Sequence, residues 1–127
     1  MLFCEALASA APAMDCDTVI SGFKLFDVLS TTRPDIIFLD INMPIMDGWE
    51  CLKKLKSDSS YHDIPVIMYS TSSAKRDIDM AYNLGARLFM TKPEDFRELT
   101  AVLGTIALEL PELSLSRLQQ FNSIKVA

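Results

Sequence analysis

The 127-residue sequence contains no phosphate-binding loop and no metal-binding cysteine motif, and its apolar N-terminal stretch is too short to cross a membrane. Its four glycines form no glycine-rich loop, which argues against nucleotide binding. Cys4, Cys16 and Cys51 form no CxxC pair and do not have metal-ligand spacing, so we expect reduced, intracellular thiols in the core. The apolar stretch 2–14 has no basic start and is too short to cross a bilayer, which predicts a cytoplasmic chain without membrane contact.

Positive charge is also scarce. Lysine and arginine number 12 against 17 aspartates and glutamates, which gives a formal net charge of -5. This balance argues against nonspecific binding to nucleic acid or to anionic lipid. With 127 residues, of which 50% are hydrophobic, the chain is long enough for one globular domain with a substantial core.

One feature that the sequence does contain is an apolar run that ends in an acid. Ile36 to Leu39 run directly into Asp40, and the turn-forming residues Pro44 and Asp47-Gly48 follow within eight positions. A continuous apolar run between turn signals indicates a strand that is buried on both faces, as in a parallel sheet covered by helices. Asp40 then lies at the carboxyl end of that strand, where open α/β sheets bind ligands.

Two more apolar runs end in polar residues. The stretch 65–70 ends in Ser70, and the stretch 87–91 is followed by Lys92. Further patterns predict a short strand at 14–20 and helices that begin near residues 2, 22, 48, 77 and 94. Strands that alternate with helices at this spacing indicate right-handed βαβ units and a parallel α/β sheet. We therefore expect Asp40, Ser70 and Lys92 to meet at one edge.

These three side chains could handle an oxyanion. A carboxylate can act as a nucleophile or as a metal ligand. An ammonium can neutralise a phosphoryl oxygen, and a hydroxyl can donate a hydrogen bond to another. The plain alternative is that Asp40 caps a strand, that Ser70 merely ends one, and that Lys92 is a solvated lysine.

The motif LD-x-NMP-x-MDG at 39–48, the strand that ends in Ser70, and Lys92-Pro93 together resemble the response-regulator receiver domain of two-component signalling. The resemblance covers residues 2–110 and implies a flavodoxin-like, doubly wound parallel sheet with helices on both faces. It implies that Asp40 accepts a phosphoryl group from a histidine kinase or a histidine phosphotransfer protein. Ser70 and Lys92 would bind the phosphoryl oxygens, in a signalling domain that is not an enzyme.

The resemblance also implies a magnesium site and a switch residue. The carboxylate of Asp40 and the backbone carbonyl of Asn42 would hold Mg²⁺, and Phe89 stands where the family places its switch aromatic. The region from helix 77–84 through strand 87–91 to the last helix would form the output and dimerisation face. The alternatives are an ordinary turn at Asn42 and a simple packing role for Phe89.

The chain departs from the family at its beginning. Receivers start with a strand that ends in two acids of the Mg²⁺ site, but residues 3–7 already align with the later part of the family's first helix. We therefore expect a truncated domain without its first strand and acidic pair. With one carboxylate left, we expect weak or absent Mg²⁺ binding and slow or absent phosphorylation.

A missing central strand needs a remedy, because it would leave two strand edges inside the sheet. The strand near residues 14–20 could shift and pair directly with the strand 36–39. A second chain could close the gap as a homodimer. The segment 123–127, which has the composition of a strand, could instead fill the gap.

We expect a receiver domain at 1–110 and a C-terminal extension at 111–127, which begins with the helix-breaking Pro111. The residue pattern of the extension predicts a short amphipathic helix, a strand, or both. The extension could pack on its own domain or contact a partner. We expect no DNA-binding domain and therefore expect output through a downstream protein. The second functional hypothesis is a pseudo-receiver that serves as an interaction module. A related aspartyl-phosphate hydrolase would need a cap domain, which is not visible.

Overall fold

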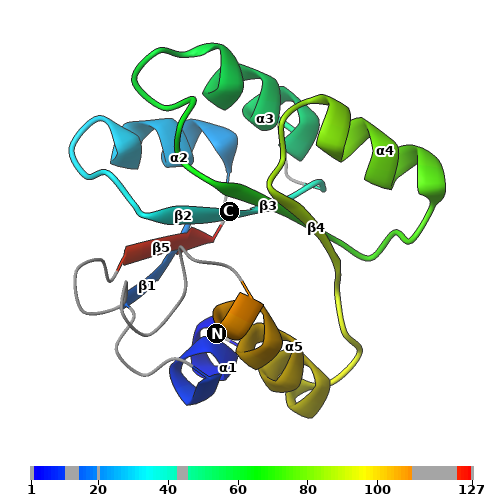
Figure 1. The fold of residues 1–127 in the computed structure, drawn as a ribbon. Helices are drawn as coiled ribbons and strands as arrows, with labels where there is room; N and C mark the ends of the chain where they lie inside the picture. Colours follow the sequence, from blue (N-terminus) through cyan, green and yellow to red (C-terminus); the bar gives the residue numbers. More distant parts are fainter. Residues whose placement is uncertain (1, 11–14, 20, 43–45, 110–122, 127) are drawn as a thin grey trace.

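Five parallel strands form one sheet in the computed structural model, which describes residues 2–10, 15–19, 21–42, 46–109 and 123–126. The strand order is β1-β5-β2-β3-β4. The elements in chain order are α1 (Leu2–Ala10), β1 (Asp15–Thr18), α2 (Gly22–Leu29), β2 (Ile36–Asp40), α3 (Gly48–Ser57), β3 (Val66–Ser70), α4 (Lys75–Asn83), β4 (Leu88–Thr91), α5 (Phe96–Glu109) and β5 (Ser123–Val126). Figure 1 shows the sheet between two layers of helices.

The C-terminal strand β5 lies inside the sheet, between β1 and β2. It pairs in parallel with β1, where Cys16 lies opposite Ile124, and with β2, where Phe38 lies opposite Val126. Of the three remedies, filling by the C-terminal segment is therefore confirmed, and direct pairing of β1 with β2 is wrong. The sheet is continuous within one chain, so it needs no homodimer to close it.

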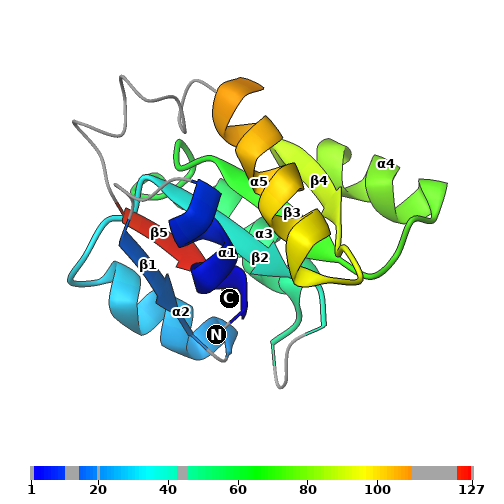
Figure 2. The same ribbon diagram turned by 90° about the horizontal axis from the view of Figure 1, so that it is seen from below.

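Helices cover both faces of the sheet, as predicted. α1 and α5 pack side by side on one face, and α2, α3 and α4 cover the other (Figures 1 and 2). The buried residues of the first core include Phe3, Leu7, Phe38, Ile67 and Leu103. Those of the second core include Leu25, Ile37, Leu39, Leu52 and Met68. Neighbouring residues of β2 belong to different cores because side chains alternate along a strand, which explains why the whole strand is apolar.

The prediction of three reduced cysteines is wrong for two of them. Cys4 of α1 and Cys16 of β1 form a disulfide, with their Cα atoms 5.5 Å apart. Their separation of 12 residues matches no sequence motif, and only the packing of α1 beside β1 brings them together. Cys51 is a free thiol and is buried, as expected for a core residue.

Helix boundaries differ by a few residues from the predicted ones. α4 begins at Lys75, two residues earlier than expected, and Gly85 follows the helix with a φ of 100°, as expected for a glycine at a helix end. α5 begins at Phe96 rather than Glu94, because Asp95 accepts a hydrogen bond from the backbone N–H of Glu98 and caps the helix. The expected amphipathic segment after Pro111 lies outside the described residues. None of the helices in the described ranges is long and apolar enough to cross a membrane.

Candidate functional site

Asp40 and Lys92 are in direct contact at the carboxyl edge of the sheet. Asp40 is the last residue of β2, and Lys92 directly follows β4. The Lys92 Nζ lies 2.5 Å from Asp40 Oδ2, and the side chains are 28% and 23% exposed, respectively. Although 52 residues separate them in sequence, the parallel sheet brings them together at the predicted edge. The remaining exposure leaves the pair accessible to a ligand.

Ser70 lies beside this pair at the end of β3. Its side chain is buried, at 2% exposure, and its Oγ accepts a hydrogen bond of 3.1 Å from the backbone N–H of Ser72. The backbone N–H of Lys92 donates to the carbonyl oxygen of Ser70 at 2.6 Å. Ser70 thus shares the edge with Asp40 and Lys92, while its hydroxyl contacts the loop that leads to α4.

The second oxygen of the Asp40 carboxylate also has a partner. The backbone N–H of Asn42 donates to Asp40 Oδ1 at 2.9 Å. The backbone N–H of Gly48 donates to the Ile41 carbonyl at 2.8 Å, and Asp47 caps α3 by accepting from the N–H of Glu50. These contacts fix the chain on both sides of residues 43–45, which lie outside the described ranges.

Glycine is required at position 48 by this close approach. A Cβ atom there would come within 2.6 Å of the Cα of Ile41, and even nearer to the Asp40 carbonyl oxygen. Only a residue without a side chain allows α3 to begin against the end of β2. The Asp-Gly pair that the sequence marks as a turn therefore serves to place α3 beside Asp40.

Sequence reasoning missed Tyr69, which contacts the Asp40–Lys92 pair. It lies opposite Asp40 in the sheet register, and the Lys92 Nζ stands 5.0 Å from the centre of its ring. Burial, together with the nearby negative charge of Asp40, raises the pKa of the Tyr69 hydroxyl. Phe3 of α1 meets the ring edge-on, with a centroid distance of 5.3 Å. The available signal was position, because Tyr69 immediately precedes Ser70.

Phe89 lies on β4, away from the helices of the first core. It is partly buried against the second core, and its backbone N–H donates to the hydroxyl of Tyr82 on α4 at 3.2 Å. Thr91 Oγ1 donates to the carbonyl oxygen of Ser72, which links β4 to the loop after Ser70. Phe89, the predicted switch residue, is therefore joined by a hydrogen bond to α4, and Thr91 joins the same strand to the loop.

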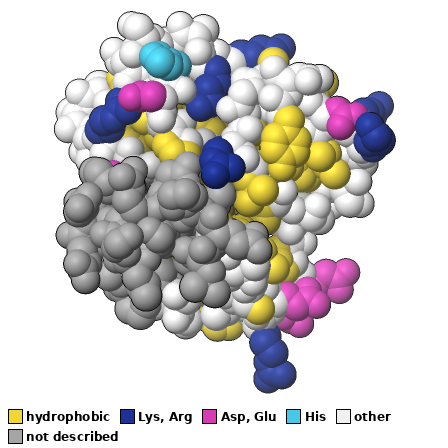
Figure 3. Space-filling view, viewed as in Figure 1, with side chains coloured by type: hydrophobic (Ala, Val, Ile, Leu, Met, Phe, Trp, Pro, Cys, Tyr) yellow, Lys and Arg dark blue, Asp and Glu magenta, His cyan; other side chains and the backbone are white. Residues whose placement is uncertain are grey.

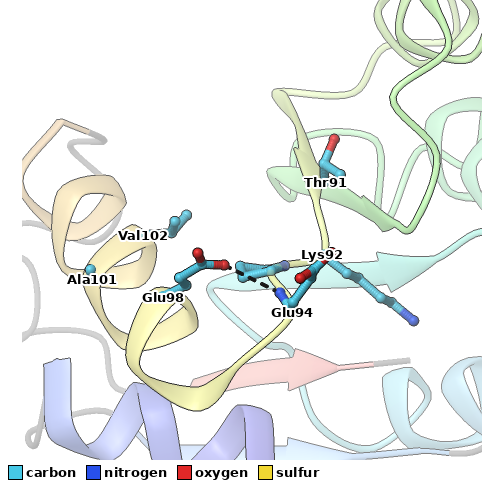
Figure 4. A pocket seen from close by; sticks show the side chains of 7 residues that line it. Thr91, Lys92, Glu94, Glu98, Ala101 and Val102 are labelled. Carbon is cyan, nitrogen blue, oxygen red and sulfur yellow. Dashed lines mark hydrogen bonds between the residues drawn. The ribbon is translucent and has the colours of Figure 1, made fainter.

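The surface near α4 and β4 carries exposed hydrophobic side chains (Figure 3). Met80 and Tyr82 of α4 are 43% and 46% exposed. On the other side of β4, a pocket lies between that strand and α5. Figure 4 shows Glu98 and Val102 on its α5 wall, while the side chain of Lys92 points away from them.

The donor set at Asp40 does not fit a magnesium ion. Receiver domains generally bind Mg²⁺ at an acidic pocket. Within the described ranges, no group of three or more His, Cys, Asp or Glu side chains could hold a metal. β5, which takes the central place in the sheet, has no acidic residue, and the Asp40 carboxylate already contacts Lys92 and the Asn42 N–H. Mg²⁺ requires near-octahedral oxygen ligation, usually with one or two carboxylates and phosphate.

The fold and the residues at the carboxyl edge of the sheet define a signalling receiver domain. The family model of the response regulator receiver domain matches residues 3–104, so the chain belongs to that family. Its fold is flavodoxin-like: the phosphorylated cyanobacterial phytochrome response regulator RcpA superposes with a TM-score of 0.75 at 34% identity, over 83% of this chain and 80% of RcpA. Receiver domains are signalling domains and are not typically catalytic.

Individual relatives differ widely in length. Protein PilG of Pseudomonas aeruginosa is 35% identical over 101 residues, which cover 78% of this chain and 73% of PilG. A protein-glutamate methylesterase/protein-glutamine glutaminase of Clostridium acetobutylicum is 40% identical over 104 residues, but these cover only 29% of that protein. Receiver domains of this kind therefore occur both as most of a protein and as a small part of one.

Proposed function

We propose that the chain is a phosphoacceptor receiver that takes a phosphoryl group on Asp40 from a histidine kinase or a histidine phosphotransfer protein. The observation that carries the proposal is the 2.5 Å contact between Lys92 Nζ and Asp40 Oδ2, beside the end of β3 at Ser70. The ends of three separate strands supply a nucleophile, a cation and a hydroxyl at one edge of the sheet. Phosphoryl transfer to a carboxylate uses groups of these three kinds.

The transfer is a displacement at phosphorus. A carboxylate oxygen of Asp40 forms the new O–P bond, the P–N bond of the phosphohistidine breaks, and the imidazole nitrogen keeps the electron pair. Lys92 then pairs with a phosphoryl oxygen, and the Ser70 hydroxyl turns from the loop to donate to another. A bound Mg²⁺ would neutralise phosphoryl charge, but the donor set argues against tight binding, so we assign it no step.

Output would pass through protein contacts. The exposed Met80 and Tyr82 on α4 lie next to β4, which carries Phe89, and this face is where we place a downstream protein partner. The net charge of -5 disfavours nucleic acid as that partner. We place the reaction in the cytoplasm, where histidine kinases hold their phosphoryl groups and where the Cys4–Cys16 disulfide is exposed to reducing conditions. We assign the chain no enzymatic turnover.

A small phosphodonor tests the proposal directly. The protein is incubated with acetyl phosphate, with and without Mg²⁺, and intact mass spectrometry follows the gain of one phosphoryl group. We expect slow incorporation that Mg²⁺ accelerates little, and none in Asp40→Asn. Asp79→Asn, which removes an exposed carboxylate that pairs with Lys75 on α4, should behave like the wild type. Incorporation that persists in Asp40→Asn would refute the assignment.

The second candidate is a pseudo-receiver that keeps the fold for protein interaction. It is favoured by the donor set, because the one carboxylate that the described residues place at the site, that of Asp40, contacts Lys92 and the Asn42 N–H. A folded protein that takes up no phosphoryl group from acetyl phosphate or from a phosphorylated phosphotransfer protein would support this candidate over the first.

A further inference from the structure

The ammonium of Lys92 lies between a carboxylate and an aromatic ring. Asp40 Oδ2 is 2.5 Å from Nζ, and the centre of the Tyr69 ring is 5.0 Å from it. A cation within about 6 Å of a ring centre is attracted by the electron-rich face. Tyr69 lies opposite Asp40 in the register of β2 and β3, so the same backbone pairing places both groups beside Lys92.

We infer that Tyr69 is a positioning residue that holds the Lys92 ammonium against Asp40. The inference deepens the proposed function, on which it rests for its biological role. A lysine side chain has four flexible bonds and no preferred direction of its own. Asp40 supplies attraction to Lys92, and the Tyr69 ring adds a second contact that restricts where the ammonium can lie.

The Lys92 ammonium could also lie in a neighbouring cavity, away from Asp40. A cavity of about 360 Å³ lies beside it, lined by Phe3, Tyr69, Lys92, Pro93, Glu94, Asp95, Phe96 and Leu99. Two of its lining residues, Glu94 and Asp95, are acidic and could attract the ammonium away from Asp40. The Tyr69 ring lines this cavity and also contacts the ammonium. It can therefore favour the position of the ammonium beside Asp40 over a position in the cavity.

The ring itself is braced from α1. Phe3 is 3% exposed and meets the Tyr69 ring at an interplanar angle of 70°, an edge-to-face arrangement. Phe3 also packs on Phe38 of β2 at 4.8 Å. The orientation of Tyr69 is therefore set by buried neighbours, which a ring that merely covered the surface would lack.

The test changes the charge distribution on the face of the ring at position 69 while it preserves the shape of the ring. Tyr69→Phe keeps the aromatic face, and incorporation of pentafluorophenylalanine at position 69 keeps the outline but removes the attraction for cations. Two measurements on the full chain report on Lys92: the ring-current shift of its ε-methylene protons by NMR, and its acetylation rate by acetic anhydride relative to exposed Lys53.

We expect wild type and Tyr69→Phe to share an upfield-shifted Lys92 signal and slow acetylation. The fluorinated ring should lose most of the shift and raise the Lys92 acetylation rate about two- to fivefold, the range that corresponds to an exposed cation–π contact. Tyr61→Leu is the matched control: it removes a half-buried tyrosine that packs on Phe26, so it should change neither measurement.

Lys92 signals that show no upfield shift in the wild type would overturn the inference, as would equal acetylation rates for the phenylalanine and the fluorinated ring. Because neither measurement requires phosphoryl transfer, their outcome is separate from that of the acetyl phosphate experiment. If the expected NMR and acetylation pattern appears but Asp40 takes up no phosphoryl group, the proposed function fails and the positioning contact stands.

Discussion

The two halves of the sheet are assembled in different ways. β2, β3 and β4 follow one another in the chain, each joined to the next by a helix, and they carry Asp40 and Ser70 and lead into Lys92. β1 and β5 are neighbours in the sheet but come from opposite ends of the chain. The chemistry therefore lies entirely on the locally assembled half, while the continuity of the sheet depends on the distant strand.

This difference separates the requirements for the site from those for the fold. The contact between Asp40 and Lys92 uses only β2, β4 and the register of β3 between them. β5 contributes backbone pairing to β1 and β2 on its two sides. Without β5, both of those strands would expose unpaired N–H and C=O groups in the middle of a sheet. The site is therefore local in geometry but depends on β5 for stability.

Removal of β5 should have the largest effect. We expect a chain truncated after residue 122 to lose its cooperative thermal unfolding transition and to aggregate, because two internal strand edges become free. Circular dichroism during heating, together with light scattering, measures both. Ile124→Pro should act in the same direction by removing a backbone donor, whereas Ile124→Val keeps strand propensity and serves as its control.

A truncated chain that melts at the wild-type temperature would show that the locally assembled half folds by itself. The site could then be studied on β2, β3 and β4 alone. If the truncated chain folds only when a peptide of residues 120–127 is added, its loss of stability is due to the absence of β5.

The locally assembled half was predictable because its signals are local. Ile36 to Leu39 are apolar throughout because β2 is buried on both faces, and the acid after them marks the end of the strand. The parallel alternation of strands and helices then places Asp40 and Lys92 at the same edge, and the structure brings them into contact. These steps need patterns of only a few residues and one topological rule.

The other half was not predictable in the same way. Three arrangements between β1 and β2 were open, namely direct pairing, a second chain or the C-terminal segment, and the strand composition of 123–127 could not decide among them. The disulfide between Cys4 and Cys16 likewise depends on how α1 packs beside β1. Tyr69 is the exception within the locally assembled half, because its contact with Lys92 arises across strands. Each of these depends on distances that sequence spacing does not contain.

Reduction of the disulfide should have the second largest effect. The bond between Cys4 and Cys16 closes a loop of 12 residues, and loops of about this size gain roughly 3 kcal/mol from cross-linking. We expect tris(2-carboxyethyl)phosphine to lower the free energy of unfolding in guanidinium by about that amount. Hydrogen exchange should show faster opening of α1 and β1 than of β3.

The double variant Cys4→Ser/Cys16→Ser supplies the control for reduction. It should match the reduced wild type and should not respond to the reductant. An unchanged denaturation midpoint on reduction would mean that packing alone holds α1 on β1, and that the distantly assembled half needs no covalent support.

A substitution in the locally assembled half should have a somewhat smaller effect. In Gly48→Ala, the new Cβ would overlap the end of β2 next to Asp40, so we expect a loss of about 2 kcal/mol from overpacking. Gly104→Ala is a matched control, because nothing lies within 4 Å of a Cβ at that position of α5. It should stabilise the protein by up to about 1 kcal/mol through helix propensity. Urea denaturation of both variants measures the difference, and equal stabilities would contradict the close approach of α3 to β2.

The smallest expected effect concerns the free thiol of the locally assembled half. Burial, with the charges of Asp47 and Glu50, raises the pKa of the Cys51 thiol to about 11, from an ordinary value of 9.0. The unfolded thiol therefore loses its proton at a lower pH than the folded one, so the free energy of unfolding must fall as pH rises from 9 to 11. We expect the decline between pH 9 and pH 10 to be about 1 kcal/mol, because one pKa unit corresponds to roughly 1.4 kcal/mol and only part of the shift acts over that interval.

The Cys51 contribution can be isolated by difference, because tyrosines and lysines titrate in the same range. Cys51→Ala should show a shallower decline in stability between pH 9 and pH 11 than the wild type, whatever its absolute stability. Parallel slopes would mean that the thiol ionises equally well in both states. That result would contradict the burial of Cys51 in the second core, which α2, α3 and α4 form with the sheet.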